Sequence, residues 1–305
     1  MSFASIVAEL AGGILLAPLL PGLIQHWKAR LQGRRGPTPL QPYRELRRLW
    51  GKSSVEIEGA GVVYRFAPAL TAASLVLAVL IVPAAAGAPS LGVGRDALAL
   101  LGVFALGRFA VAAASWDVGN GFALMGASRD LMIAVFTDAT FVLAVAVAAL
   151  VAQTTDLSAM IAGTAGSATW SNPALALAAV AFAFVLVAET GRQPIDNPDT
   201  HLELTMIHEG RLLEYAGRDL AFLHWSAAAR HWIVLVLATQ IFLPHSTSVW
   251  GQLALLPVAL VALCAGLALL ETLTAKMRIL LAPRLLAVGA AAALLGIVSW
   301  LVQVS

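Results

Sequence analysis

The sequence is poor in cysteine and in charge. Its 305 residues include one cysteine, Cys264, and only 12% are charged. A single cysteine excludes a disulfide framework and any iron–sulfur or zinc site ligated by cysteines of this chain alone. The six histidines fall in expected loops or at the ends of apolar runs, whereas membrane haem needs ligands inside a helix bundle. We therefore expect no redox centre and no metal site on this chain, and whether it takes part in an enzyme reaction stays open at this point.

Apolar residues are abundant instead. They make up 60% of the chain, and the mean hydropathy is +0.85, which is typical of an integral membrane protein. A helix needs about 20 residues to cross the roughly 30 Å hydrocarbon core. We expect an all-α, polytopic integral membrane protein with eight transmembrane helices and cytoplasmic amphipathic segments, forming a single membrane domain over 1–305. The expected spans are 3–24, 66–86, 97–116, 131–152, 174–190, 231–244, 252–273 and 285–303.

Lysine and arginine are concentrated in alternate connections between these spans. Because positive charge near span ends is retained in the cytoplasm, this pattern predicts the orientation. It places both termini outside, and it places four loops in the cytoplasm, at about 26–65, 117–130, 191–230 and 274–284.

The first cytoplasmic loop contains an amphipathic stretch, Tyr43–Trp50. Its apolar residues share one helical face and its arginines point elsewhere, which is the pattern of a helix lying in the membrane interface. The alternative is a basic loop that only obeys the orientation rule.

The third cytoplasmic loop is rich in ionisable residues. Asn197-Pro198-Asp199 has the pattern of a helix start, and Asp199 and Glu203 are four residues apart on one face. Such carboxylates repel each other and titrate as a pair, unless they form only a solvated acidic face. His201 and His208 are seven residues apart and are candidates for a proton relay.

Two charged residues lie inside expected spans, Arg108 and Asp138. An unpaired charge in the hydrocarbon costs roughly 2.5–3.5 kcal/mol. Both are about 10–12 Å from the expected cytoplasmic end of their spans at 1.5 Å per residue, so we expect them to form a pair. The pair either fixes helix register or belongs to an ion path.

Three motifs carry a resemblance to a known family. Glu189-Thr-Gly-Arg-Gln-Pro-Ile-Asp196 resembles the Glu-Thr-Asn-Arg-x-Pro-Phe-Asp motif of the complex I membrane subunit at the quinone pocket, the subunit 1 family with eight spans. Arg35-Gly-Pro37 with Leu40-Gln-Pro42 resembles that family's first cytoplasmic loop. Glu214-Tyr-Ala-Gly217 is similar to its Glu-Tyr-Ser-Gly.

Within that family, 119–130 and 196–209 resemble the branch of formate hydrogenlyase subunit 4 and the hydrogenase-4 membrane subunits, which anchor group 4 nickel–iron hydrogenases. His201 stands where the quinone-linked branch has Glu, which weighs against a quinone site. The resemblance implies a membrane-anchoring, ion (H⁺ or Na⁺) translocation-coupling subunit in a bacterial or archaeal inner membrane.

The resemblance also implies partners and residue roles. Nickel–iron and iron–sulfur centres are expected on partner subunits, with no cofactor on this chain. The implied partners are hydrogenase large and small subunits and an iron–sulfur protein on the cytoplasmic face, antiporter-like membrane subunits and the lipid bilayer, but no nucleic acid. The implied ion pathway is Arg108, Asp138, Glu189, Arg192, Asp196, Asp199 and Glu203, and the implied docking residues are Arg34, Arg35, Arg129, Arg211, Glu214 and Arg218.

Two other functions remain as alternatives. One is the quinone-site subunit of an NADH:quinone-type oxidoreductase. The other is an independent ion or solute transporter, for which inverted repeats are expected; no convincing repeat relates 1–150 to 151–305.

Overall fold

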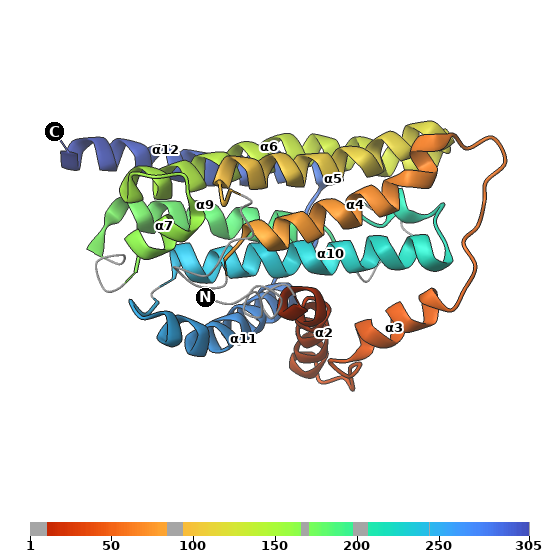
Figure 1. The fold of residues 1–305 in the computed structure, drawn as a ribbon, viewed down its shortest axis with the longest axis horizontal. Helices are drawn as coiled ribbons and strands as arrows, with labels where there is room; N and C mark the ends of the chain where they lie inside the picture. Colours follow the sequence, from red (N-terminus) through yellow and green to blue (C-terminus); the bar gives the residue numbers. More distant parts are fainter. Residues whose placement is uncertain (1–10, 84–93, 166–170, 198–206, 244, 305) are drawn as a thin grey trace.

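The computed structural model describes residues 11–83, 94–165, 171–197, 207–243 and 245–304. The regular elements of this part of the chain are helices, so the all-α prediction is confirmed (Figure 1). They are α2 (Leu19–Leu31), α3 (Gln41–Trp50), α4 (Val62–Ile81), α5 (Ala97–Val118), α6 (Gly121–Ala152), α7 (Leu157–Gly163), α9 (Pro173–Glu189), η1 (Gly210–Leu212), α10 (Gly217–Leu237), the π-helical turn η2 (Ala238–Phe242), α11 (Val249–Leu273), η3 (Ile279–Leu281) and α12 (Ala282–Val304).

Six described helices are long and apolar enough to cross a membrane, which agrees with a multi-pass membrane protein. The apolar helix α9 is shorter, at 17 residues. The first expected span, 3–24, begins outside the described residues; its described part is helical over 11–16 and again from Leu19. The described helices therefore do not establish the predicted count of eight. The six are Val62–Ile81, Ala97–Val118, Gly121–Ala152, Gly217–Phe242, Trp250–Leu273 and Ile279–Val304.

Two helices begin well before the predicted spans. Helix α6 starts at Gly121 rather than 131, and α10 starts at Gly217 rather than 231. Most of the expected loop 117–130 and the last part of the expected loop 191–230 are therefore helical. The prediction was wrong there because polar residues interrupt the apolar runs. Two of them, Asp130 and Ser226, are buried inside the molecule rather than exposed in loops.

The turn between α5 and α6 explains how these helices become antiparallel neighbours. Gly119 ends α5 with a left-handed backbone, φ +71°, a conformation that glycine adopts without the usual Cβ penalty. The Asn120 side chain then accepts a hydrogen bond from the backbone N–H of Phe122 and caps α6. Two residues therefore reverse the chain, and α5 and α6 pack against each other as neighbours.

Aromatic rings connect four elements in the core. Phe104 of α5, Phe141 of α6, Phe182 of α9 and Phe242 of η2 form a series in which successive ring centroids are 6.1, 5.5 and 4.6 Å apart. All four are buried. These contacts hold the helices that carry the buried charges described below.

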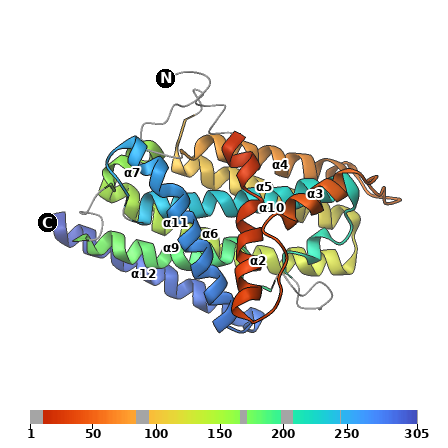
Figure 2. The same ribbon diagram turned by 90° about the horizontal axis from the view of Figure 1, so that it is seen from below.

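Helices α2 and α3 differ from the long helices in their direction or position. Figure 2 shows α2 running across the direction of α6, α9 and α12. The predicted amphipathic stretch is a helix, α3, which packs against α10 and α2. Leu49 of α3 is buried, and Trp50 meets the ring of Phe222 edge to face at 5.1 Å. The helix is confirmed, while its place in the membrane interface stays a prediction.

Candidate functional site

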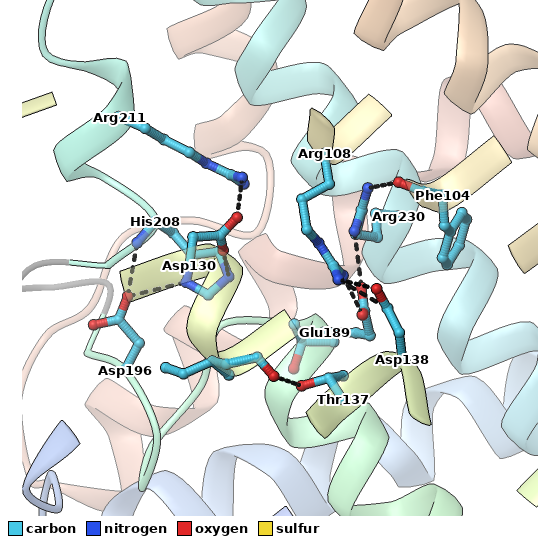
Figure 3. A network of polar contacts seen from close by, with 12 residues as sticks. Phe104, Arg108, Asp130, Thr137, Asp138, Glu189, Asp196, His208, Arg211 and Arg230 are labelled. Carbon is cyan, nitrogen blue, oxygen red and sulfur yellow. Dashed lines mark hydrogen bonds and ion pairs between the residues drawn. The ribbon is translucent and has the colours of Figure 1, made fainter. Parts of the chain in front are cut away.

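Four charged side chains meet between α5, α6, α9 and α10 (Figure 3). We call Arg108, Asp138, Glu189 and Arg230 the central cluster. Arg108 donates from Nη1 to Oδ1 and Oδ2 of Asp138 at 2.8 and 2.7 Å, and from Nη2 to Oε1 of Glu189 at 2.5 Å. The predicted contact between Arg108 and Asp138 is therefore confirmed, and Glu189, the last residue of α9, joins it.

Arg230 was missed by the sequence argument. It donates to Oε2 of Glu189 at 3.0 Å and to the carbonyl oxygen of Phe104 at 3.1 Å, and its guanidinium carbon lies 4.8 Å from the Phe104 ring centroid. The central cluster thus contains two cations and two carboxylates, and its charges balance. Balance matters here, because each isolated charge at this depth costs roughly 2.5–3.5 kcal/mol.

A second group of charges surrounds His208 at one end of α6, and we call Asp130, Asp196, His208, Arg211 and Lys276 the loop cluster. His208 Nδ1 lies 3.0 Å from Oδ2 of Asp196, and its Nε2 lies 3.6 Å from Oδ1 of Asp130. Arg211 donates to Asp130 at 2.5 Å, and Lys276 donates to Asp196 at 3.3 Å. One histidine therefore stands between two carboxylates that each have a basic partner.

Close backbone packing positions this second group. A Cβ added at Gly126 of α6 would come within 2.8 Å of backbone atoms of Gly210 and Arg211. Only glycine allows the 207–212 turn to approach α6 this closely. As a result, Arg211 and His208 reach Asp130, one turn further along α6.

The ionisation of Asp196 is set by its neighbours. Burial raises the pKa of this carboxyl, but hydrogen bonds from the side chain and backbone N–H of His208 more than offset burial and hold the pKa well below its usual range. Asp196 is therefore a stable anion in the loop, which favours a structural anchor over a group that exchanges protons near neutral pH.

A third group of charges joins α2 to α11. Glu271 Oε1 lies 3.0 Å from Arg192 Nη1, and its Oε2 lies 3.1 Å from Lys28 Nζ. All three residues are buried. Arg192, predicted as a pathway residue, thus contacts α11 rather than the central cluster, and Lys28 was not foreseen, since it was assigned to the basic first loop.

A cavity of about 620 Å³ connects these groups. It is bordered by apolar residues of α2, of α3 and of the residue that precedes α2, such as Pro21, Leu46 and Pro18. Its charged wall contains residues from all three groups, namely Arg108, Glu189, Arg230, Asp130, Asp196, His208, Arg211 and Arg192. The arrangement can hold a chain of polar groups, with or without water, between the loops and the middle of the helix bundle.

The remaining predicted residues are distributed as follows. Arg34, Arg35 and Arg218 are exposed, while Arg129 and Glu214 are half-buried. The Glu214 side chain accepts a hydrogen bond from Asn120, which ties the 213–217 segment to the α5–α6 turn. The last three predicted residues, Asp199, His201 and Glu203, lie outside the described residues, as does most of the predicted helix start at 197–199.

Comparisons with known proteins agree with this architecture. The family model described as NADH dehydrogenase matches residues 4–301. The chain is 33% identical to formate hydrogenlyase subunit 4 of Escherichia coli over 294 residues, covering 94% of each chain. It is 30% identical to hydrogenase-4 component C of the same organism, covering 94% of this chain and 92% of that one.

Two further proteins are less similar in sequence, and the fold of one of them is known. Identity to an NADH-quinone oxidoreductase subunit of Rickettsia prowazekii is 22%, over 70% of this chain and 64% of that one. A chain in the solved structure of an archaeal membrane-bound sulfane sulfur reductase, a respiratory membrane complex, superposes with a TM-score of 0.81 at 22% identity, covering 96% of this chain and 99% of that one. The protein belongs to the NADH dehydrogenase family, of the complex I subunit 1 type.

Proposed function

We propose that this member of the NADH dehydrogenase family is the membrane subunit of a hydrogenase-type or formate hydrogenlyase-type complex related to complex I, and that it couples a redox reaction on partner subunits to ion movement. The first part is supported by the similarity to two hydrogenase-linked relatives over more than nine-tenths of the chain. Electrons would stay on partners that carry nickel–iron and iron–sulfur centres.

One observation carries the coupling proposal: Glu189 is held between two arginines from different helices, at 2.5 Å from Arg108 and 3.0 Å from Arg230. A carboxylate shared by two cations can exchange one partner for the other when a nearby charge changes. Glu189 also borders the cavity that reaches the loop cluster. A change of charge near the loops would therefore alter the pairing of Glu189, Arg108 and Asp138 in turn.

The partner arm would sit on the end of the molecule where several connections meet. The Tyr64 hydroxyl donates to the carbonyl oxygen of Glu214 at 2.7 Å, and Gly217 packs against the backbone of Ser53. Segments 51–61 and 207–216 thus form one surface with the α5–α6 turn. We propose that this surface, together with exposed Arg34 and Arg35, binds the soluble subunits on the cytoplasmic side.

The test replaces Glu189 by glutamine in the intact complex. Glu189→Gln keeps the shape of the side chain but removes its charge, so the two arginines lose their shared anion. We expect ion movement and membrane-coupled turnover to fall by roughly tenfold or more. A tenfold change in rate corresponds to about 1.4 kcal/mol, which is less than the several kcal/mol that breaking a buried ion pair costs. Hydrogen oxidation with an artificial dye should continue, because it needs only the peripheral arm.

A control is available in Asp156→Asn, which also converts a carboxylate to an amide, at an exposed position outside the proposed binding surface. Nickel and iron content of the gently solubilised complex measures assembly in both variants. If Glu189→Gln assembles with full metal content and moves ions at the wild-type rate, the coupling proposal is wrong. If the chain purifies without nickel and iron, the complex-subunit proposal is wrong and the transporter alternative gains.

A second candidate, quinone binding, is favoured by the cavity itself. Its volume of about 620 Å³ lies within the usual range for small-molecule pockets. His231 borders it and is buried, and among the described residues its Nε2 has no hydrogen-bond partner. This candidate requires quinone in the purified complex and inhibition of turnover by quinone-site inhibitors. The absence of both would leave only ion coupling.

A further inference from the structure

One face of the α5–α6 pair is exposed and carries a carboxylate at its edge. The exposed residues repeat every three or four positions, so they share one side of each helix. On α5 they are Gly102, Ala105 and Phe109, and on α6 they are Val135, Ala139 and Val142.

Asp138 belongs to the edge of this face. It lies three residues after Val135 and four before Val142, which places it on the same side of α6. Its side chain is 39% exposed, whereas that of its partner Arg108 is 8% exposed. Asp138 is not among the residues that border the cavity, so the exposed part of its carboxylate opens to the outside of the chain.

The depth of this carboxylate makes its exposure costly. Asp138 lies near the middle of the 32-residue helix α6, and Arg108 lies near the middle of α5. On the expected spans both residues lie about 10–12 Å from the cytoplasmic end of the hydrocarbon, so this carboxylate is inside the apolar layer. If the exposed part of an ionised carboxylate faced lipid tails there, it would lose its solvation, and Arg108 alone would compensate for it.

We propose that a transmembrane helix of another subunit covers this face and places a neutral hydrogen-bond donor beside Asp138. The donor would be a hydroxyl, an amide or a protonated carboxyl, because the central cluster is already balanced and an added base would leave a net charge in the membrane. Arg108 Nη1 reaches both carboxylate oxygens, but each oxygen can accept a further hydrogen bond.

Small residues on the face fit the close approach of another helix. A Cβ added at Gly102 would meet no atom within 4 Å. Ala105 and Ala139 also have small side chains, which would let the backbone of another helix come close. Helix pairs in membranes associate through such small residues and through hydrogen bonds between polar side chains. The inference rests on the proposed function only in that the chain works within a larger complex; it does not require ion movement.

Site-directed cross-linking tests the inference in the assembled complex in native membranes. A small diazirine-bearing analogue of leucine, introduced by codon reassignment, needs no thiol chemistry and no access to the covered face. It is placed at Val135 and at Val142, one turn before and one turn after Asp138, and at Val258, on α11, as a control with similar exposure. The complex is irradiated, and the products are identified by mass spectrometry.

We expect both positions on α6 to cross-link to the same membrane helix of another subunit, and we expect that helix to carry a hydroxyl, amide or carboxyl side chain between the two attachment points. The control should not reach that helix. Adducts with lipid only, cross-links to a second copy of this chain, or a partner helix without such a side chain would each overturn the inference.

A second measurement does not depend on cross-linking chemistry. Val135→Trp adds a bulky ring to the proposed interface, and Val258→Trp adds it to the control position. We expect Val135→Trp to reduce recovery of the cross-linked subunit in the purified complex by roughly tenfold, because an overpacked interface binds more weakly. Val258→Trp should leave the recovery unchanged. The two proposals can fail separately. If the expected cross-links form but Glu189→Gln moves ions at the wild-type rate, the helix interface is supported and only the coupling proposal is rejected.

Discussion

Arg108 donates to both carboxylate oxygens of Asp138, at 2.8 and 2.7 Å, from the middle of one transmembrane helix to the middle of the next. The Gly119–Asn120 turn makes α5 and α6 neighbours. A single guanidinium therefore links α5 to α6 and, through Glu189, to α9. The pair therefore links neighbouring helices and is also a candidate step in an ion path.

A double-mutant cycle separates the contribution of this pair from the rest of the central cluster. Asp138→Asn should lower the yield of assembled complex, because Arg108 keeps only Glu189 as an anionic partner. Arg108→Gln should lower it further, since Arg108 contacts two carboxylates. In the double variant we expect partial recovery, equivalent to a coupling energy of roughly 0.5–3 kcal/mol.

Complex yield after solubilisation and thermal aggregation of the solubilised complex measure this cycle. Strictly additive losses in the double variant would mean that Arg108 and Asp138 do not interact in the membrane.

Asp196 gives a prediction about pH. Its pKa is lower in the folded chain than in the unfolded chain, so the folded state binds its proton less readily. Its contribution to stability is therefore complete above the unfolded pKa of about 3.9 and is lost as the pH falls toward the folded pKa. Asp196→Asn should destabilise the solubilised chain at pH 7, by roughly 1.5–3 kcal/mol for a charge-assisted contact.

Thermal unfolding of wild type and Asp196→Asn at several pH values checks this sign. The difference in midpoint should narrow once the pH falls below about 4, while Glu58→Gln should show little effect at any pH. A difference that widens in acid would show that Asp196 is not held as an anion by His208.

The sequence predicted the parts of the site that lie within clean apolar runs. Arg108 and Asp138 each interrupt such a run. Their pairing could be predicted because an unpaired charge in the hydrocarbon is costly and because the two residues have the same expected depth. Arg230 and Asp130 lie where polar residues precede the apolar run, and their charges were assigned to loops. Sequence alone could not reveal that the 207–212 turn covers this end of α6, because that contact depends on long-range packing at Gly126.

The same reasoning explains the errors at helix starts. A span is recognised by its apolar residues, but α6 has 32 residues and α10 continues through η2, so both are longer than the hydrocarbon requires. Their first turns can be polar and still buried, since side chains such as Asp130 find ion-pair partners inside the protein. Charged residues in these first turns form ion pairs inside the protein. They are therefore poor indicators of which loops are exposed.

Docking of soluble partners predicts a change in protease sensitivity. Arg34 and Arg35 are exposed in the first loop, and Arg278 is exposed outside the expected docking segments. In intact membranes trypsin should cut at Arg278 but spare the first loop. After alkaline or high-salt stripping, cleavage at Arg34 and Arg35 should appear, whereas Arg211 should stay protected by its contact with Asp130.

Peptide mapping of digested membranes gives the result directly. Equal cleavage of the first loop before and after stripping would contradict docking at that loop.

The final prediction concerns Glu203, which was expected to share a helix face with Asp199. The segment that carries both is bounded by Asp196 and His208, which contact each other at 3.0 Å. Glu203 and Asp199 themselves lie outside the described residues. If the acidic pair responds to redox turnover on the partner subunits, Glu203→Gln should depress membrane-coupled turnover and ion movement while assembly and metal content stay at wild-type levels.

Three readouts are needed to separate coupling from folding, and Asp156→Asn, at an exposed position outside the proposed binding surface, serves as the control. Metal content reports assembly, artificial-dye hydrogen oxidation reports the peripheral arm, and ion movement in vesicles reports the membrane step. Because the substitution removes one charge from a coupled pair, only the third should fall, together with membrane-coupled turnover. Wild-type turnover and ion movement in Glu203→Gln would mean that the acidic pair is a solvated helix face, and the path from the partner arm would then have to reach Glu189 through His208 and Asp130 instead.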